Sequence, residues 1–312
     1  MGKTNFNILL ALVVLVALFP FVVSDSYNLT IGVFAGTNAL LALGLCILMG
    51  FAGQASLGQA GFYGIGAYVS AILSMKFGLP VALSMVAAAA VSGISAILIA
   101  VPALRLKGHY LAVATLGFGE IVYVILNELG PGGPSGFGDI PHLSLFGFVF
   151  DSAVSNFYLV WSFVILIIIF SFNLVNSRIG RAMKAIHDSE VASNAMGLDV
   201  ASLKIKVFIL SAIYASFAGS FYGHFITFLS PSTFSLFQSI LVLMMVIFGG
   251  ASNLWGAVVG AIIITILPEA LRRFDELDVL IYGIILTLSL LFMRKGLVPL
   301  LMDKLKTEKR HA

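Results

Sequence analysis

The chain has 312 residues, of which 60% are hydrophobic and 10% are charged, with a formal net charge of +3. Soluble domains carry about 25% charged residues, so this composition excludes a soluble globular protein and predicts an all-α integral membrane protein. The small net charge gives no sign of nucleic-acid binding. Glycine and proline are spread through apolar stretches and form no linker, so we expect residues 1–312 to be a single transmembrane domain. Cys46 is the only cysteine, which excludes an internal disulfide.

About ten apolar segments are candidates for membrane spans, each of which takes about 20 helical residues. The first follows Lys3 and looks like the apolar part of a signal peptide, but no clean small-residue cleavage pattern follows it, so we interpret it as a retained span. The eighth and ninth segments are short and separated only by 249–252, which leaves one re-entrant hairpin as the alternative to two spans. The predicted spans are 6–23, 31–49, 57–75, 81–101, 110–127, 157–175, 205–228, 233–248, 253–267 and 279–293.

The distribution of Lys and Arg favours ten crossings with the N and C termini both cytoplasmic. On that scheme only Lys76, Arg272 and Arg273 lie outside, which is the asymmetry that the positive-inside rule predicts. A single hairpin would instead place the carboxyl terminus outside, unless the pair returned to the side it left. The cytoplasmic residues would be Lys3, Arg105, Lys107, Arg178, Arg181, Lys184, Lys204, Lys206, Arg294, Lys295, Lys304, Lys306, Lys309 and Arg310.

A glycine-rich stretch, GFAGQASLGQAGFYGIGAY at 50–68, interrupts the apolar pattern. Its first part, 50–56, predicts a break between spans. A helix from about Leu57 would then carry small residues three or four positions apart, and such faces let helix backbones approach closely in lipid. Gln54 and Gln59 add amides at membrane depth, where unpaired polar groups are costly. The stretch is therefore either a packing seam or a close-packed helix that borders a substrate path; its small residues are Gly58, Gly61, Gly64, Ala67, Ala71 and Ser74.

Glu120 is the carboxylate nearest the middle of a predicted span. An ionisable group at that depth is by default a functional hypothesis, and a hydrogen-bonded structural acid is the alternative. A proton-coupled carrier would show relays of such groups, whereas those within these spans are isolated. This argues against a secondary transporter that acts alone.

The connection at about 128–156 is expected to be external. It has no Lys or Arg, and it holds PGGPSGFGDIP, whose glycines and prolines predict an irregular, exposed course. It is either a plain long loop or a docking surface for an external protein.

The connection at about 177–204, which we call the elbow, is expected to be cytoplasmic and helical. Ile179, Met183 and Ile186 share one helical face, while the basic side chains of 178–184 fall on another. Such a helix either lies in the lipid headgroups or forms a docking element for a cytoplasmic partner.

A second short helix is expected within the elbow. Asp188 or Ser189 can cap it, with Glu190 in its first turn and Gly197 at its end. Asp199 can then cap the next membrane helix.

Sequence motifs for catalysis are missing. The chain has no Gly-x-x-x-x-Gly-Lys-Ser/Thr phosphate loop, and the metal and nucleophile signatures His-Glu-x-x-His, Cys-x-x-Cys and Gly-x-Ser-x-Gly are also missing. We therefore expect no enzyme activity, no catalytic or metal-binding residue and no cofactor. If ATP drives this protein, another chain must hold the nucleotide.

Three regions of the chain, in this order, carry a resemblance to a known family. They are GQASLGQAGFYGIGAYVSAIL at 53–73, ATLGFGEIVYVILNELGPGGPSGFGDIP at 114–141 and RIGRAMKAIHDSEVASNAMGLDVASLKIKVFILSAIYASFAGSFYGHF at 178–225. Together they resemble the LivM-like permease subunits of ABC importers for branched-chain (hydrophobic) amino acids, proteins of the bacterial inner membrane.

The resemblance implies a role and a set of partners. Subunits of this kind pair with a second, homologous permease, carry two cytoplasmic ATPases, which use the ATP, and receive substrate from an external binding protein. The elbow would be the coupling segment, with Glu190 and Gly197 in its acidic and glycine positions and Arg181 and Lys184 before them. Transport would follow an alternating-access mechanism. Relatives in the same superfamily carry other small solutes, such as amides, urea, other amino acids, sugars or nucleosides.

The chain departs from the family pattern at two places. The elbow reads Glu190-Val191-Ala192 where the family has Glu-Ala-Ala, and Tyr123 stands where relatives often have an arginine soon after the membrane glutamate. The second departure weakens any ion-pair role for Glu120.

Overall fold

The structure is a computed structural model that describes residues 3–23, 25–103, 109–145, 147–271, 283–284 and 287. Nine of the ten predicted spans fall within these residues and all nine are helical, while the tenth, 279–293, lies almost wholly outside them. The predicted all-α membrane fold is thus confirmed for the described part of the chain. The nine helices are α1 (Lys3–Val22), α2 (Ser26–Leu45), α3 (Gln59–Lys76), α4 (Val81–Ala103), α5 (His109–Leu129), α6 (Ala153–Asn176), α9 (Val200–Ile226), α10 (Leu236–Gly249) and α11 (Leu254–Leu271).

Seven of the described helices are long and apolar enough to cross a bilayer by length and composition, namely α1, α2, α4, α5, α6, α9 and α11. The other two depart from a simple span for different reasons. Glycines and glutamine lower the hydropathy of α3, and α10 has only 14 residues. These are the two helices that border the glycine-rich break and the break at 249–252.

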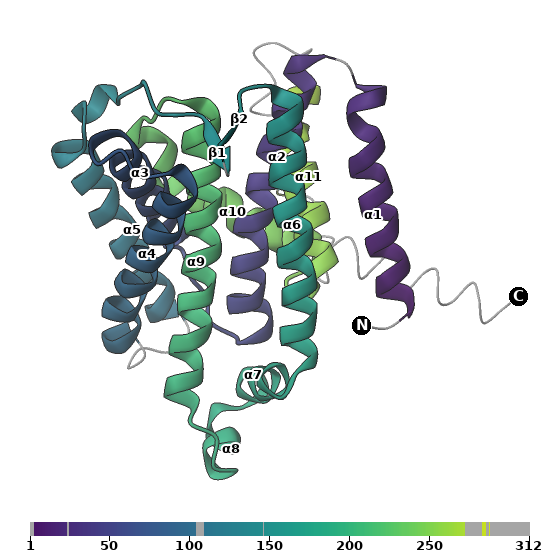
Figure 1. Cartoon of the computed structure of the whole chain (residues 1–312). Coiled ribbons are helices and arrows are strands. Elements are labelled where there is room, and N and C mark those ends of the chain that lie inside the picture. The colour runs from purple at the N-terminus through teal and green to yellow at the C-terminus, as the bar shows by residue number, and fades with distance from the viewer. Residues whose placement is uncertain are drawn as a thin grey trace, which may run out of the picture.

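The helices form one bundle with two distinct ends (Figure 1). The short helices α7 (Arg178–Asp188) and α8 (Glu190–Ala195) project from one end, toward which the start of α1 also points, and we call it the elbow end. The other end carries the small strands β1 (Leu143–Leu145) and β2 (Phe148–Phe150), and we call it the loop end. Helix α9 lies inside the bundle against α2, α3 and α4, whereas α1 packs mainly on α6.

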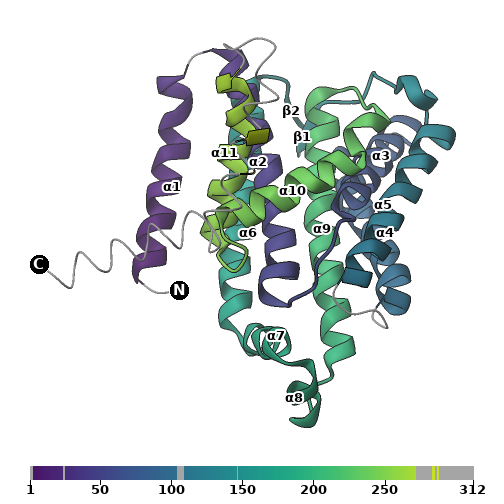
Figure 2. The same cartoon turned by 180° about the vertical axis from the view of Figure 1, so that it is seen from behind.

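The segments 233–248 and 253–267 form the two helices α10 and α11, which are joined by a short turn at 250–253. After Leu229, which pairs with Phe137 at the loop end, the chain passes through a short 3-10 turn, η3 (Pro231–Phe234), and α10 then runs obliquely across the bundle (Figure 2). Helix α11 returns to the loop end, where Glu269 accepts a hydrogen bond from the Tyr27 hydroxyl at the start of α2. The chain therefore leaves the loop end after Leu229 and returns to it at the end of α11, and α10 is the shorter of the two helices.

The loop at 128–156 is packed onto the bundle more closely than its composition predicts. It forms a 3-10 turn, η2 (Gly133–Ser135), and then the antiparallel pair β1–β2, with Leu143 opposite Phe150. Ile140 and Leu143 are buried, although Phe148 is exposed. The buried His224 on α9 fastens the loop, since its Nδ1 lies 2.7 Å from the carbonyl oxygen of Pro141. Most of the loop is irregular and exposed or half-buried, as predicted, whereas β1 covers part of α4 and α9.

Candidate functional site

The elbow begins with a tight turn out of the membrane helix α6. The Ser177 hydroxyl accepts hydrogen bonds from the backbone N–H groups of Ile179 and Gly180, at 3.1 and 3.3 Å, and so caps α7. A side chain at Gly180 would place its Cβ 2.1 Å from the carbonyl oxygen of Val175. Only glycine therefore lets α7 turn so closely under the end of α6.

One face of α7 is buried, but it is not quite the predicted one. Met183 and Ile186 are buried, together with Gly180, whereas Ile179 is 49% exposed. Ile179 shares the predicted face with Met183 and Ile186 but lies at its exposed edge, because the turn at Ser177 brings the Gly180 side of the first turn against α6. Arg181 and Lys184 lie on the exposed side, as does Arg178.

The predicted caps of the second half of the elbow are confirmed. Ser189 caps α8, with its hydroxyl 3.3 Å from the N–H of Ala192, and Glu190 is the first residue of that helix. Gly197 follows α8 with a φ of +80°, a left-handed conformation that favours glycine. Asp199 then caps α9 by accepting a hydrogen bond from the N–H of Ser202 at 3.0 Å.

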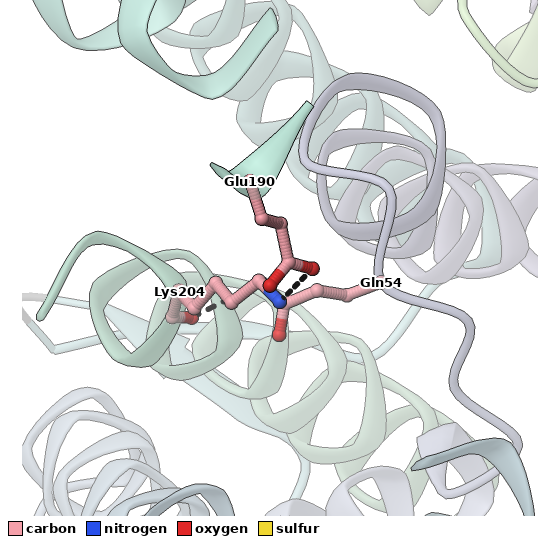
Figure 3. A network of polar contacts seen from close by, with 3 residues as sticks. All are labelled: Gln54, Glu190 and Lys204. Carbon is pink, nitrogen blue, oxygen red and sulfur yellow. Dashed lines mark hydrogen bonds and ion pairs between the residues drawn. The ribbon is translucent and has the colours of Figure 1, made fainter. Parts of the chain in front are cut away.

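An ion pair joins α8 to the base of α9 (Figure 3). Glu190 pairs with Lys204, whose side chain is only 8% exposed. The amide of Gln54, itself 2% exposed, donates a hydrogen bond of 3.3 Å to the carbonyl oxygen of Lys204. The elbow is thereby tied to the segment that leads into α3.

A second junction forms at Gly50, the last but one residue of a π-helical extension of α2, η1 (Cys46–Phe51). Its carbonyl oxygen lies 3.1 Å from Nδ1 of His187 on α7, a hydrogen bond that requires the proton on Nδ1. The same oxygen accepts a hydrogen bond of 3.0 Å from the hydroxyl of Ser252, in the turn between α10 and α11. We call these three residues the Gly50 junction; it joins the elbow, the end of α2 and the α10–α11 turn.

Gly50 permits this junction because it has no side chain. A Cβ at this position would lie 1.7 Å from the carbonyl oxygen of Ala251, so any other residue would push the α10–α11 turn away. Beside it, the Lys184 ammonium lies 5.7 Å from the centroid of the Phe51 ring, within the range of a cation–π contact. Sequence reasoning missed His187 and Ser252, because single polar residues in a basic helix and a short turn carry no motif.

The glycine-rich segment places the remaining predicted residues around the start of α3. The chain is not helical from Ala52 to Gly58, as the break at 50–56 predicts, and α3 starts at Gln59. Gly58, Gly61 and Gly64 face α5, where a Cβ on Gly58 would lie 2.6 Å from the carbonyl oxygen of Thr115. The Gln59 amide donates a hydrogen bond of 2.9 Å to the Ser211 hydroxyl on α9.

The expectation of a single small-residue face on α3 is wrong. Steps of three residues drift by about 60° each around a helix of 3.6 residues per turn, so Ala67 has moved away from Gly58 and contacts Gly223 on α9. A different pair makes the closest approach to α9. A Cβ on Gly66 would lie 2.2 Å from the carbonyl oxygen of Ser216, and one on Gly219 would lie 2.0 Å from that of Tyr63.

Glu120 lies near the middle of α5, as expected, and is half-buried. It borders a small recess between α5, the start of α3 and α10, lined also by Ala60, Phe234 and Ser239. Within the described residues its carboxyl group makes no hydrogen bond or ion pair. The same part of the chain contains no group of three or more His, Cys, Asp or Glu side chains that could hold a metal ion.

Comparison with known proteins agrees with this architecture. Residues 28–290 match the family described as branched-chain amino acid transport system / permease component. The chain is 33% identical to the high-affinity branched-chain amino acid transport system permease protein LivM of Salmonella typhimurium, over 97% of this chain and 77% of the relative, and 33% identical to that of Escherichia coli, over 96% and 76%. The probable LivM of Methanocaldococcus jannaschii is 24% identical over 64% of this chain and 62% of its own. No solved structure matches significantly.

Proposed function

This chain belongs to the family of permease components of branched-chain amino acid transport systems, and from that premise we propose that it is the membrane subunit of an ATP-driven importer. The chain is a multi-pass protein of the inner membrane. Its substrates are branched-chain and other hydrophobic amino acids. It contributes the path and no enzyme activity, since the nucleotide is held by partner subunits.

The observation that carries the proposal is the Gly50 junction. An amphipathic, basic helix stands at one end of the bundle, and its His187 bonds directly to the end of α2 and, through the Gly50 carbonyl, meets the α10–α11 turn. A force on α7 is thereby transmitted to three membrane helices. An interfacial helix lying in the headgroups would need no such connection.

The complex has the composition that the family implies. Two cytoplasmic ATPases act on the permeases, and the exposed Arg181 and Lys184 of this chain contact one of them. A second, homologous permease forms the other half of the membrane unit, and an external binding protein delivers the substrate. Nucleotide binding shifts the alternating-access equilibrium through its different affinity for the two states.

The elbow is tested by reversing its exposed charges in the assembled importer. Arg181→Glu together with Lys184→Glu should lower ATP-driven leucine uptake into vesicles at least tenfold, because like charges across an interface cost several kcal/mol and 1.4 kcal/mol is about tenfold. The variant should still insert and be recovered at the normal yield. Lys76→Glu, an exposed charge reversal at the last residue of α3, should leave uptake unchanged.

Two outcomes would contradict the proposal at different levels. Normal uptake by the double variant would remove the elbow as the contact of the ATPase. If the wild-type complex takes up urea or a sugar and no branched-chain amino acid, the substrate is wrong, whereas the driving mechanism stands.

A further inference from the structure

A cavity of about 470 Å³ lies between α2, α10 and α11, with α3 and α9 closing its inner side. Its size falls within the about 300–1,000 Å³ of small-molecule sites, which combine apolar walls with a few convergent polar groups. The cavity has this composition. Its polar side chains come from six elements of the fold and are Thr37, Asn38, Tyr63, Tyr222, Thr233, Gln238 and Thr265.

Three of these polar groups form a partly satisfied network. The side-chain amide nitrogen of Asn38 donates a hydrogen bond of 2.9 Å to the Thr265 hydroxyl. The side-chain amide nitrogen of Gln238 lies 3.5 Å from the side-chain oxygen Oδ1 of Asn38. Thr265 in turn donates to the carbonyl oxygen of Ala261 at 2.7 Å. Within the described residues nothing bonds to the side-chain oxygen of Gln238. The network therefore holds its amides in place and keeps capacity for a ligand.

Two tyrosines add unpaired hydroxyls to the same cavity. Tyr63 is 3% exposed, and its ring centroid lies 5.7 Å from that of Tyr222. Neither hydroxyl makes a hydrogen bond to any described residue. Both hydroxyls therefore remain available to donate to or accept from a polar ligand, or its water, in the cavity.

Every described residue that lines the cavity is uncharged. The α-ammonium and α-carboxylate of an amino acid would meet only hydroxyl and amide dipoles, and a third charge on the substrate side chain would find no partner. Burying an unpaired charge is far more costly than burying a neutral group. The apolar lining residues, which include Phe34, Leu241, Met245 and Ile264, suit an aliphatic side chain instead.

We propose that this cavity is the substrate site within the membrane path and that it takes one zwitterionic amino acid with an uncharged, aliphatic side chain. This inference rests on the proposed function and adds the site and the physical basis of its selectivity. The absence of charged groups makes the site weak, as a path requires if the solute is to leave again. The same three helices, α2, α10 and α11, meet at the Gly50 junction, so the elbow and the cavity share their moving parts.

The site is tested by protection of an introduced cysteine from alkylation. Cys46→Ser, at the only cysteine of this chain, gives a cysteine-free permease within the assembled importer, and alkylation is scored on this subunit alone. Gln238→Cys then places a thiol in the cavity, and Ile240→Cys places one on the same helix but outside the cavity, where Ile240 is 37% exposed. Millimolar leucine should slow alkylation at position 238 several-fold and leave that at 240 unchanged, while lysine should protect neither.

A second measurement connects the protection to the two tyrosines. Adding Tyr63→Phe and Tyr222→Phe removes only the hydroxyls, and each lost hydrogen bond should raise the half-protecting leucine concentration by roughly threefold to tenfold. Equal alkylation rates at 238 with and without leucine, or protection by lysine equal to that by leucine, would overturn the proposed site. ATP-driven leucine uptake by the cysteine-free complex is measured separately, so loss of the site and loss of the proposed function give different results.

Discussion

At the scale of single residues, the fold depends on places where two backbones touch. Gly66 on α3 and Gly219 on α9 face each other's helices, and each would place a Cβ within 2.2 Å of a carbonyl oxygen across the interface. Helix association in lipid relies on close packing, because lipid tails are as apolar as the side chains and the hydrophobic effect does not drive helices together. A single methyl group at this contact must therefore move one helix.

We expect Gly66→Ala to lower the stability of the protein in detergent by about 1–3 kcal/mol, the usual cost of overpacking a filled interior. Thermal unfolding of the purified chain measures this. The matched control is Gly117→Ala on α5, where an added Cβ meets nothing within 4 Å; it should be neutral or slightly stabilising, because alanine favours a helix by up to about 1 kcal/mol over glycine. Equal melting temperatures for the two variants would show that α3 and α9 are not in close contact.

Sequence patterns predicted local features such as helix caps well, and contacts between residues far apart in the sequence poorly. Residue type and position identified Asp199 as a cap and narrowed the cap of α8 to Asp188 or Ser189, because an N-cap bonds within three residues of itself; the structure shows that Ser189 is the cap. The partner of Glu190 is Lys204, 14 positions away. In the cavity, Asn38 bonds to Gln238 and Thr265, which are 200 and 227 positions away. Such pairs depend on the tertiary arrangement, which no spacing rule in a single sequence encodes.

At the scale of elements, the elbow connects to the bundle through two links of different character. The Glu190–Lys204 ion pair ties α8 to α9, and the Gly50 junction ties α7 to α2 and to the α10–α11 turn. Helix periodicity predicted that α7 would be amphipathic, with Ile179, Met183 and Ile186 on one face, but only Met183 and Ile186 of these are buried. This difference arises because the pattern predicts which residues share a face of the helix. The turn that precedes the helix decides how that face is rotated against the neighbouring helix.

We predict that His187→Ala together with Ser252→Ala uncouples the importer without disassembling it. Both hydrogen bonds to the Gly50 carbonyl are lost, each contributing about 0.5–1.5 kcal/mol, so the elbow can move without moving α2. Leucine uptake per ATP hydrolysed should fall roughly threefold to tenfold in reconstituted vesicles. His142→Ala, an exposed histidine at the loop end, is the control and should keep the wild-type ratio. A double variant that retains the wild-type ratio would exclude the Gly50 junction from coupling.

At the scale of the whole molecule, the described helices occupy the segments that hydropathy predicted as membrane spans. Helices α7 and α8 and the start of α1 lie toward the elbow end of the bundle. Lys76 is the last residue of α3. Glu269 accepts a hydrogen bond from Tyr27 at the loop end. Nine of the ten predicted segments are helical among the described residues, because hydropathy is summed over many residues. Hydropathy was least informative at α10, because a 3-10 turn followed by a short helix has no hydropathy pattern of its own.

The chain lacks the residues that would let it use either ATP or a proton gradient by itself, as far as the sequence motifs and the described residues show. The chain contains no phosphate-binding loop, and the carboxyl group of Glu120 stands without a polar partner among the described residues, so a proton relay through it has no second member there. We expect the purified chain alone, in phosphatidylethanolamine and phosphatidylglycerol vesicles, to accumulate no leucine against a gradient, with ATP or with an imposed proton gradient. Adding the second permease, the two ATPases and the external binding protein should produce ATP-dependent accumulation. Concentrative uptake driven by the proton gradient, with no companion subunit present, would instead make this protein a secondary transporter and assign Glu120 to its proton path.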